Sequence, residues 1–182
     1  IWWMAAIKMG VLMNNQLSEI CSDSIVSMVK KGVRRFKRPE VGDLFTLEMQ
    51  DIGFIHGMVA RNDLEFVKGQ ADFNIIYIYK EITKNQSDNL SLAKSELMFP
   101  PFIVNDMAWR QGYFQTYDSI PISEIDVFNE YCFYSKAKKQ YENERWESCK
   151  AFEPCSDLVL SSSLTIAIKI YMRLNPKMKI LD

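Results

Sequence analysis

The feature that most constrains the fold is a succession of strand-like patterns in the middle of the chain. Residues 43–49 alternate between apolar and polar side chains as a half-buried strand does, and residues 54–61 resume the extended pattern after a turn at 50–53. These two segments predict a β-hairpin. Residues 73–79 are the clearest strand, because β-branched and aromatic side chains follow one another there. A chain with these segments is expected to be built on a sheet.

Further extended segments are predicted downstream. The segment 99–104 contains two consecutive prolines, which cannot donate backbone hydrogen bonds, so it is expected to enter at a sheet edge. Residues 109–117 and 125–134 also look extended, and Gly112 predicts a bulge or a close backbone approach. Residues 90–98 fit either a short helix or a strand.

Helices are expected at the margins. Residues 14–31 have roughly helical apolar spacing, and two lysines followed by Gly32 are a typical helix end. Residues 135–150 are charged and are expected to be partly helical, on the surface. Residues 164–174 fit both a strand alternation and a helical stripe. A helix is favoured there, because the three serines at 161–163 supply N-caps and an Asn-Pro pair follows.

These patterns predict an α+β fold, mainly an antiparallel β-sheet with peripheral helices, and the sheet could curl into a half-barrel. No alternating βαβ pattern supports a parallel sheet. The chain has 182 residues and 48% hydrophobic side chains, which suits one main domain. We divide it into residues 1–38, comprising an apolar arm, a helix and a basic connector, and a domain at residues 39–182.

Charge gives little support for nucleic-acid binding. The formal net charge is −1, whereas proteins that bind nucleic acids are usually clearly basic. The basic connector (residues 30–38) could still contact phosphates, and a nucleic-acid-binding or regulatory module is the alternative function. A solvated connector is the favoured interpretation, because Phe36 alone does not make a stacking platform. The connector's cationic residues are Lys30, Lys31, Arg34, Arg35, Lys37 and Arg38.

The cysteines and the first residues bear on location. Four cysteines occur without a C-x-x-C pair, which favours free thiols in a reducing, cytoplasmic compartment. Residues 1–13 are apolar, but a membrane-spanning helix needs about 20 residues. We interpret them as a hydrophobic arm or an upstream extension and expect no membrane role, with a secretion signal as the alternative.

Signals of catalysis are missing. His56 is the single histidine, and it lies inside a predicted strand, which favours a structural role. No P-loop, nucleophile elbow or dinucleotide-binding fingerprint is present. The carboxylates have no spacing that distinguishes an acid/base pair or a calcium loop from a solvated surface. We therefore expect no enzyme, no cofactor and no metal site.

Several short motifs in a fixed order resemble the immunity protein 26 family. The similarity covers about residues 39–175 and rests on order and spacing rather than on any single motif. The motifs are Pro-Glu-Val-Gly-Asp-Leu-Phe at 39–45, Gly-Phe-Ile-His-Gly-Met-Val at 53–59, Phe-Pro-Pro-Phe-Ile at 99–103, Trp-Arg-Gln-Gly-Tyr-Phe at 109–114 and Tyr-Cys-Phe at 131–133.

The resemblance implies a bacterial immunity protein, of the kind encoded beside polymorphic or contact-dependent toxins. Its partner would be a cognate toxin domain, which it would neutralise by blocking the active site without catalysis. The resemblance identifies neither the toxin nor the oligomeric state.

Many toxins of this kind are nucleases with basic clefts, so an acidic surface would steer association. The candidate interface residues are Asp118, Glu124, Asp126, Glu130, Glu142, Glu144 and Glu147. Ordinary solvated acids are the alternative for this set. Trp109, Tyr113 and Phe114 could anchor the toxin or belong to the core, and the core is favoured.

Overall fold

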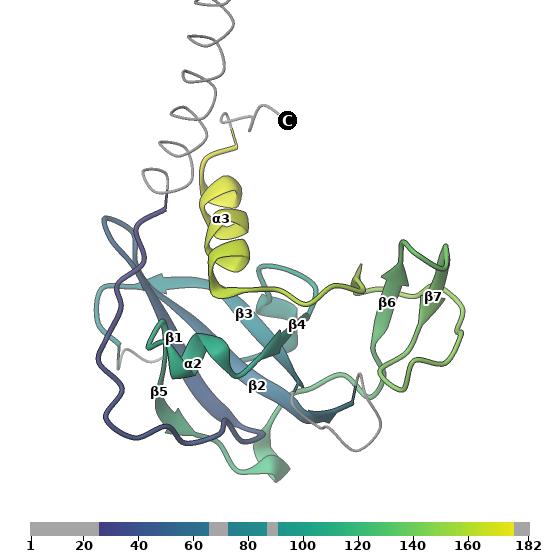
Figure 1. Cartoon of the computed structure of the whole chain (residues 1–182), viewed down its shortest axis with the longest axis horizontal. Coiled ribbons are helices and arrows are strands. Elements are labelled where there is room, and N and C mark those ends of the chain that lie inside the picture. The colour runs from purple at the N-terminus through teal and green to yellow at the C-terminus, as the bar shows by residue number, and fades with distance from the viewer. Residues whose placement is uncertain (1–25, 66–72, 87–90, 177–182) are drawn as a thin grey trace, which may run out of the picture.

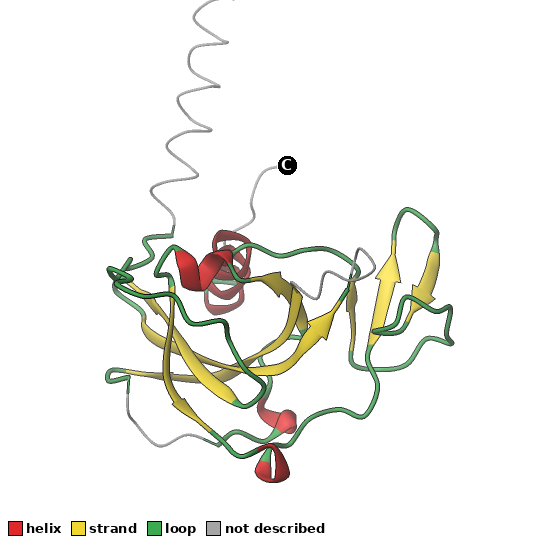
Figure 2. Cartoon of the chain, turned by 60° about the horizontal axis from the view of Figure 1, so that its bottom comes forward, coloured by secondary structure: helices red, strands yellow, loops and turns green. Residues whose placement is uncertain are grey.

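The computed structural model describes residues 26–65, 73–86 and 91–176. A five-stranded antiparallel sheet, in the order β4-β3-β2-β1-β5, forms its body. The sheet curves but stays open, with β4 and β5 as its two edges (Figure 2). Its strands are β1 (Asp43–Met49), β2 (Gly53–Leu64), β3 (Phe73–Thr83), β4 (Phe102–Asn105) and β5 (Phe114–Ser119). The α+β prediction with a mainly antiparallel sheet is confirmed.

A second, three-stranded sheet lies beside the first (Figure 1). In it, β6 (Cys132–Ser135) pairs with β7 (Gln140–Glu142) antiparallel and with β8 (Cys155–Asp157) parallel. Four short helical elements complete the described chain. They are η1 (Lys94–Glu96), α2 (Met107–Arg110), η2 (Ile122–Glu124) and α3 (Ser163–Leu174).

Both faces of the main sheet are buried, which explains why β3 is almost continuously apolar. Ile76 and Ile78 point to the face that α2 and α3 cover, and Ile75, Tyr77 and Tyr79 point to the other face. Successive side chains of a strand alternate between the two faces of the sheet. When both faces are covered, side chains at most positions of the strand are buried and therefore apolar.

The first face is closed by helix α3 and by aromatic packing. Ile166, Ala167 and Ile170 of α3 are fully buried in the same cluster as Phe45 of β1. The helix predicted at 164–174 is confirmed, and its start is fixed by the Ser162 Oγ, which accepts from the Thr165 backbone N–H. The predicted stop after Leu174 is also correct.

Close packing explains one glycine of the hairpin. Gly57 on β2 is paired with Phe45 on β1, and a Cβ at this position would collide with the Phe45 ring and lie 2.6 Å from the Tyr77 carbonyl oxygen. The β1–β2 hairpin predicted from the sequence is confirmed, and its register runs from the Leu44–Met58 pair to the Met49–Gly53 pair. The proline pair before β4 indeed introduces an edge strand.

The helix predicted at 14–31 is wrong in its described part. Residues 26–31 are extended, and the Val29 backbone N–H donates to the Glu48 carbonyl while the Lys31 N–H donates to that of Gly112. Pairing with the sheet therefore outweighs the local helical spacing. Residues 14–25 and the apolar arm at 1–13 lie outside the described residues. The domain boundary at residue 38 stays a prediction.

Three further assignments need correction. Residues 109–110 belong to helix α2, which ends at Arg110, and the turn after it passes through Gly112 (φ +81°), so the extended segment begins at Phe114. Gly112 does make the predicted close approach, to the Lys31 carbonyl oxygen. Of residues 125–134, only 132–134 lie in a strand. Residues 125–131 run as a loop over the buried cluster that contains Tyr77 and Tyr79, which we call the second core.

The segment 135–150 forms a turn and strand β7 instead of a helix. Its turn passes through Lys139 in the left-handed region (φ 55°), and the Tyr134 and Tyr141 rings then pack across β6 and β7 with centroids 5.1 Å apart. Within residues 91–98 the chain has a single 3₁₀ turn, η1.

Candidate functional site

An acidic segment connects the main sheet to the second sheet. Residues 118–130, which we call the acidic segment, contain four carboxylates and no lysine or arginine. The segment leaves the end of β5, passes through η2 and crosses toward β6 on the side of the molecule opposite α3 (Figures 1 and 2). All four of its carboxylate residues, Asp118, Glu124, Asp126 and Glu130, are exposed.

The four acids differ in their partners. Asp126 forms an ion pair with Lys94 at 3.0 Å and accepts from the Lys94 backbone N–H, and these contacts lower the pKa of Asp126. The Asp118 carboxylate accepts a hydrogen bond from the backbone N–H of the neighbouring Ser119. Within the described part of the chain, Asp118, Glu124 and Glu130 have no cationic partner. Three carboxylates of the acidic segment therefore form no ion pair within the described residues.

An exposed isoleucine stands within this acidic segment. Ile122, the first residue of η2, is 71% exposed, the highest value among the large apolar side chains described. Its neighbour Glu124 ends the same 3₁₀ turn. Apolar side chains scattered on a surface are normal, but an exposed one in a segment rich in exposed carboxylates has the composition of an interface anchor with a polar rim. Sequence reasoning missed Ile122, because an isoleucine between predicted strands looks like a core residue.

The other acids of the predicted set lie about the second sheet and serve the fold. Glu142 is buried and forms an ion pair with Lys138 at 2.8 Å, which lowers the pKa of Glu142. The Glu147 carboxylate accepts from the Asn143 side chain and thereby closes a turn after β7. Glu147 remains exposed, whereas Glu142 has no surface to offer a partner.

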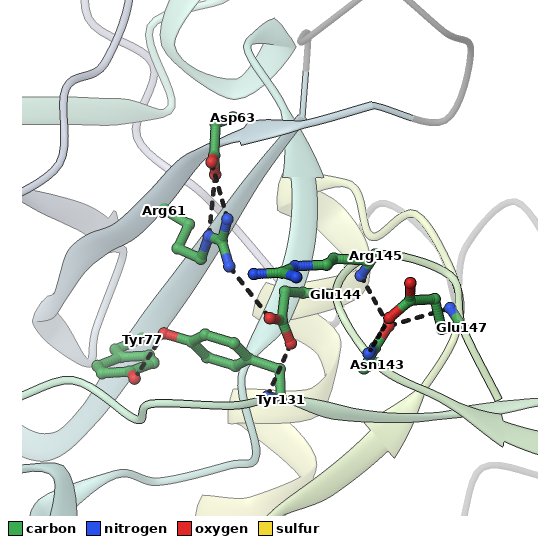
Figure 3. A network of polar contacts seen from close by, with 8 residues as sticks. All are labelled: Arg61, Asp63, Tyr77, Tyr131, Asn143, Glu144, Arg145 and Glu147. Atoms are coloured by element: carbon green, nitrogen blue, oxygen red, sulfur yellow. Dashed lines mark hydrogen bonds and ion pairs between the residues drawn. The ribbon is translucent and has the colours of Figure 1, made fainter. Parts of the chain in front are cut away.

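Glu144 belongs to a polar network that joins the two sheets (Figure 3). Its side chain is 7% exposed, and it forms an ion pair with Arg61 of β2 at 3.3 Å. It also accepts from the Tyr131 backbone N–H at 3.1 Å, just before β6. Arg61 in turn makes a two-pronged contact with Asp63, which raises the pKa of Arg61 and lowers that of Asp63.

The network continues into the second core. The Tyr131 hydroxyl lies 3.0 Å from that of Tyr77 on β3, and the Tyr77 hydroxyl accepts from the Phe128 backbone N–H. Burial is the main cause that raises the pKa of both tyrosines. The end of the acidic segment is therefore anchored on the sheet, while its exposed part projects from it.

His56 is fully buried on β2 and is held between two hydroxyls. Its Nε2 lies 2.7 Å from the Thr83 Oγ1, and its Nδ1 lies 3.1 Å from the Tyr117 hydroxyl. Because the Thr83 hydroxyl donates to the Asn85 carbonyl, it accepts from the Nε2–H, and Nδ1 then accepts from Tyr117. A substrate could not reach this ring, so the arrangement agrees with the structural role expected for His56.

The basic connector lies along the edge of the main sheet. Lys31 forms an ion pair with Glu48, Lys37 with Glu40, and the Arg38 Nε lies 4.0 Å from Asp106. Arg35 and Lys37 line a hollow of about 310 Å³ whose other wall includes Trp109 and Phe114. Much of the connector's charge is therefore compensated by the domain itself.

The aromatic candidates are mainly core residues. Trp109 and Phe114 are buried and pack edge-to-face with centroids 4.9 Å apart, as favoured from the sequence, whereas Tyr113 is partly buried against them. Among residues 26–65, 73–86 and 91–176, no group of three or more histidine, cysteine or acidic side chains could hold a metal ion. In the same ranges, no helix is long and apolar enough to cross a membrane.

The fold and the surface define a class of protein: a compact α+β domain with an exposed acidic segment, whose single histidine is buried. A comparison with protein families then identifies the family. The model of the family described as immunity protein 26 matches residues 40–143, more than half of the chain, and the chain belongs to this family. No curated protein and no solved structure matches the chain.

The match confirms the family suggested by the motifs over a shorter range than residues 39–175. It includes the main sheet, the acidic segment, β6 and β7. Helix α3, β8 and residues 26–39 lie outside it.

Proposed function

We propose that this protein binds a cognate bacterial toxin in the cytoplasm of the producing cell and blocks the toxin's active site, without catalysing a reaction. Membership of an immunity protein family supports the protective role. The observation that carries the proposed interface is the exposed Ile122, which lies among three carboxylates without a cationic partner in the described residues. We propose the acidic segment as the toxin-binding surface.

The charge of this surface suits a toxin with a basic cleft, such as a nuclease. Complementary charges accelerate the encounter and fix the orientation of two proteins. Affinity then comes from a few well-packed side chains near the centre of the interface. Ile122 supplies such a centre, and Asp118, Glu124 and Glu130 supply the charged rim.

We propose only some of the predicted acidic residues as toxin-binding residues. Glu142 and Glu144 are almost fully buried and hold Lys138, Arg61 and the Tyr131 backbone, so we assign them to the fold. Asp126 forms an ion pair with Lys94, and we place it at the edge of the binding surface. Glu147 is exposed but shapes its own turn, and we place it outside the interface.

A growth-protection assay tests this assignment. Bacteria expressing the toxin domain encoded next to this gene should survive when they also express the wild-type chain. Ile122→Asp and the triple variant Asp118→Asn, Glu124→Gln, Glu130→Gln should each lose protection while remaining folded.

Two matched controls separate the surface from general damage. Met172→Asp changes an exposed apolar residue on α3, on the opposite side of the molecule, and Glu81→Gln neutralises an exposed acid on β3. Both should protect as well as the wild type. Full protection by the folded triple and Ile122→Asp variants would show that the acidic segment is not the interface. Failure of the wild-type chain to protect would overturn the function itself.

A further inference from the structure

Three cysteines gather around the second sheet. Cys132 lies on β6 and is 1% exposed, whereas Cys155 on β8 and Cys149 in the loop after β7 are partly exposed. All three carry free thiols in this structure. A cluster of this kind differs from a set of core residues, because two of its three cysteines are partly exposed.

Cys132 and Cys155 are placed to react with each other. They are direct partners in the parallel β6–β8 register, and their Sγ atoms lie 3.0 Å apart. Neighbouring strands run about 4.8 Å apart, which falls within the Cα separation of about 4.4–6.8 Å that a disulfide requires. The register and the Sγ–Sγ distance therefore place this pair within reach of a disulfide.

The surroundings favour thiol–disulfide chemistry over metal binding. In the described residues, no group of three or more histidine, cysteine or acidic side chains could hold a metal ion. Cys149 contacts Cys132, and burial followed by this contact raises the pKa of Cys149. Among the described residues, Cys149 is therefore the one other cysteine that could form a disulfide with Cys132 in place of Cys155.

We propose that Cys132 and Cys155 form a reversible disulfide that joins β6 to β8, with a low-molecular-weight disulfide such as oxidised glutathione as the oxidant. The Cys155 thiolate attacks one sulfur of oxidised glutathione, forming a mixed disulfide and releasing one glutathione. The Cys132 sulfur then attacks the Cys155 Sγ and releases the second glutathione. Two protein thiols lose two electrons and two protons, and one oxidised glutathione becomes two reduced molecules.

The surroundings of Cys155 determine how fast the disulfide forms. Burial, followed by the hydrogen bond with Cys132, raises the pKa of Cys155 to about 12, so its reactive thiolate is scarce at neutral pH. Bridging should therefore be slow near pH 7 and should accelerate as the pH rises. The bond would close the segment 132–155, which contains β7 and the Glu144 contact to Arg61.

The test uses the full chain incubated with oxidised glutathione at pH 7 and pH 9, followed by alkylation of the remaining thiols, proteolysis and mass spectrometry. We expect one internal bridge, between the peptides of Cys132 and Cys155, that forms faster at pH 9 and is reversed by dithiothreitol. Cys149→Ser is the matched control and should form the same bridge, whereas Cys155→Ser should form none of this kind.

Peptide mapping of the wild-type chain decides the matter even if a variant fails to fold. Alkylation of both Cys132 and Cys155 after prolonged oxidation would overturn the proposal. So would a bridge from Cys132 to Cys149, or a stable glutathione adduct on Cys155 that Cys132 does not displace.

Discussion

Glu144→Ala should destabilise the protein without removing any surface that we propose for binding. The substitution leaves the Tyr131 backbone N–H without its acceptor, and an unsatisfied group in a part-buried position costs about 1–3 kcal/mol. It also removes the ion pair to Arg61, which is 30% exposed and keeps Asp63, so this loss adds no more than about 1 kcal/mol.

The expected total is a loss of about 1–4 kcal/mol in the free energy of unfolding. For a protein of this size, that corresponds to a fall of roughly 2–16 °C in the midpoint of thermal unfolding. Urea and thermal unfolding followed by circular dichroism measure both quantities. Glu124→Gln is the control, because Glu124 is exposed and its side chain makes no hydrogen bond or ion pair within the described residues, and it should change stability by less than about 0.5 kcal/mol.

Comparing the stabilities of Glu144→Ala and Glu124→Gln can refute the assignment of Glu144 to the fold and of Glu124 to the binding surface. If Glu144→Ala unfolds like the wild type, the network in Figure 3 does not hold the two sheets together. If Glu124→Gln is the more damaging change, the division between structural and binding carboxylates is reversed.

Two further predictions concern the fold. Gly57→Ala should lower the free energy of unfolding by about 1–3 kcal/mol or more, because its Cβ meets the Phe45 ring and the Tyr77 carbonyl; a wild-type urea midpoint would contradict this packing. Lys138 lowers the pKa of Glu142, so the folded state binds fewer protons than the unfolded state, and this contribution to stability is present above about pH 4.5 and is lost as the pH falls. Glu142→Gln should therefore flatten the acid limb of the stability curve, and an unchanged limb would show that another carboxyl governs it.

The parts of the fold that could be predicted from sequence are those set by local patterns. The β1–β2 hairpin follows from alternation on either side of a turn, and α3 follows from its serine cap and helical stripe. The second sheet could not be predicted in this way. Its β6–β8 pair joins Cys132 to Cys155, which are far apart in sequence and carry no shared pattern.

The candidate site shows the same division. The sequence locates the acidic segment, because a run of four carboxylates without a cation is visible directly. It cannot tell Glu144 from Glu124, since the difference depends on Arg61 and the Tyr131 backbone, which only the folded chain brings to Glu144. Nor can it tell that Ile122 faces solvent, because exposure is decided by what packs around a residue.

Calorimetric titration of the purified chain with the purified toxin domain encoded by the adjacent gene tests the central claim most directly. We predict a stoichiometric complex in which toxin activity disappears at the equivalence point. The triple variant of Asp118, Glu124 and Glu130 should bind more weakly, and its affinity should depend less on salt concentration. The absence of a complex, or inhibition that requires turnover of the toxin's substrate or product by this chain, would contradict the account.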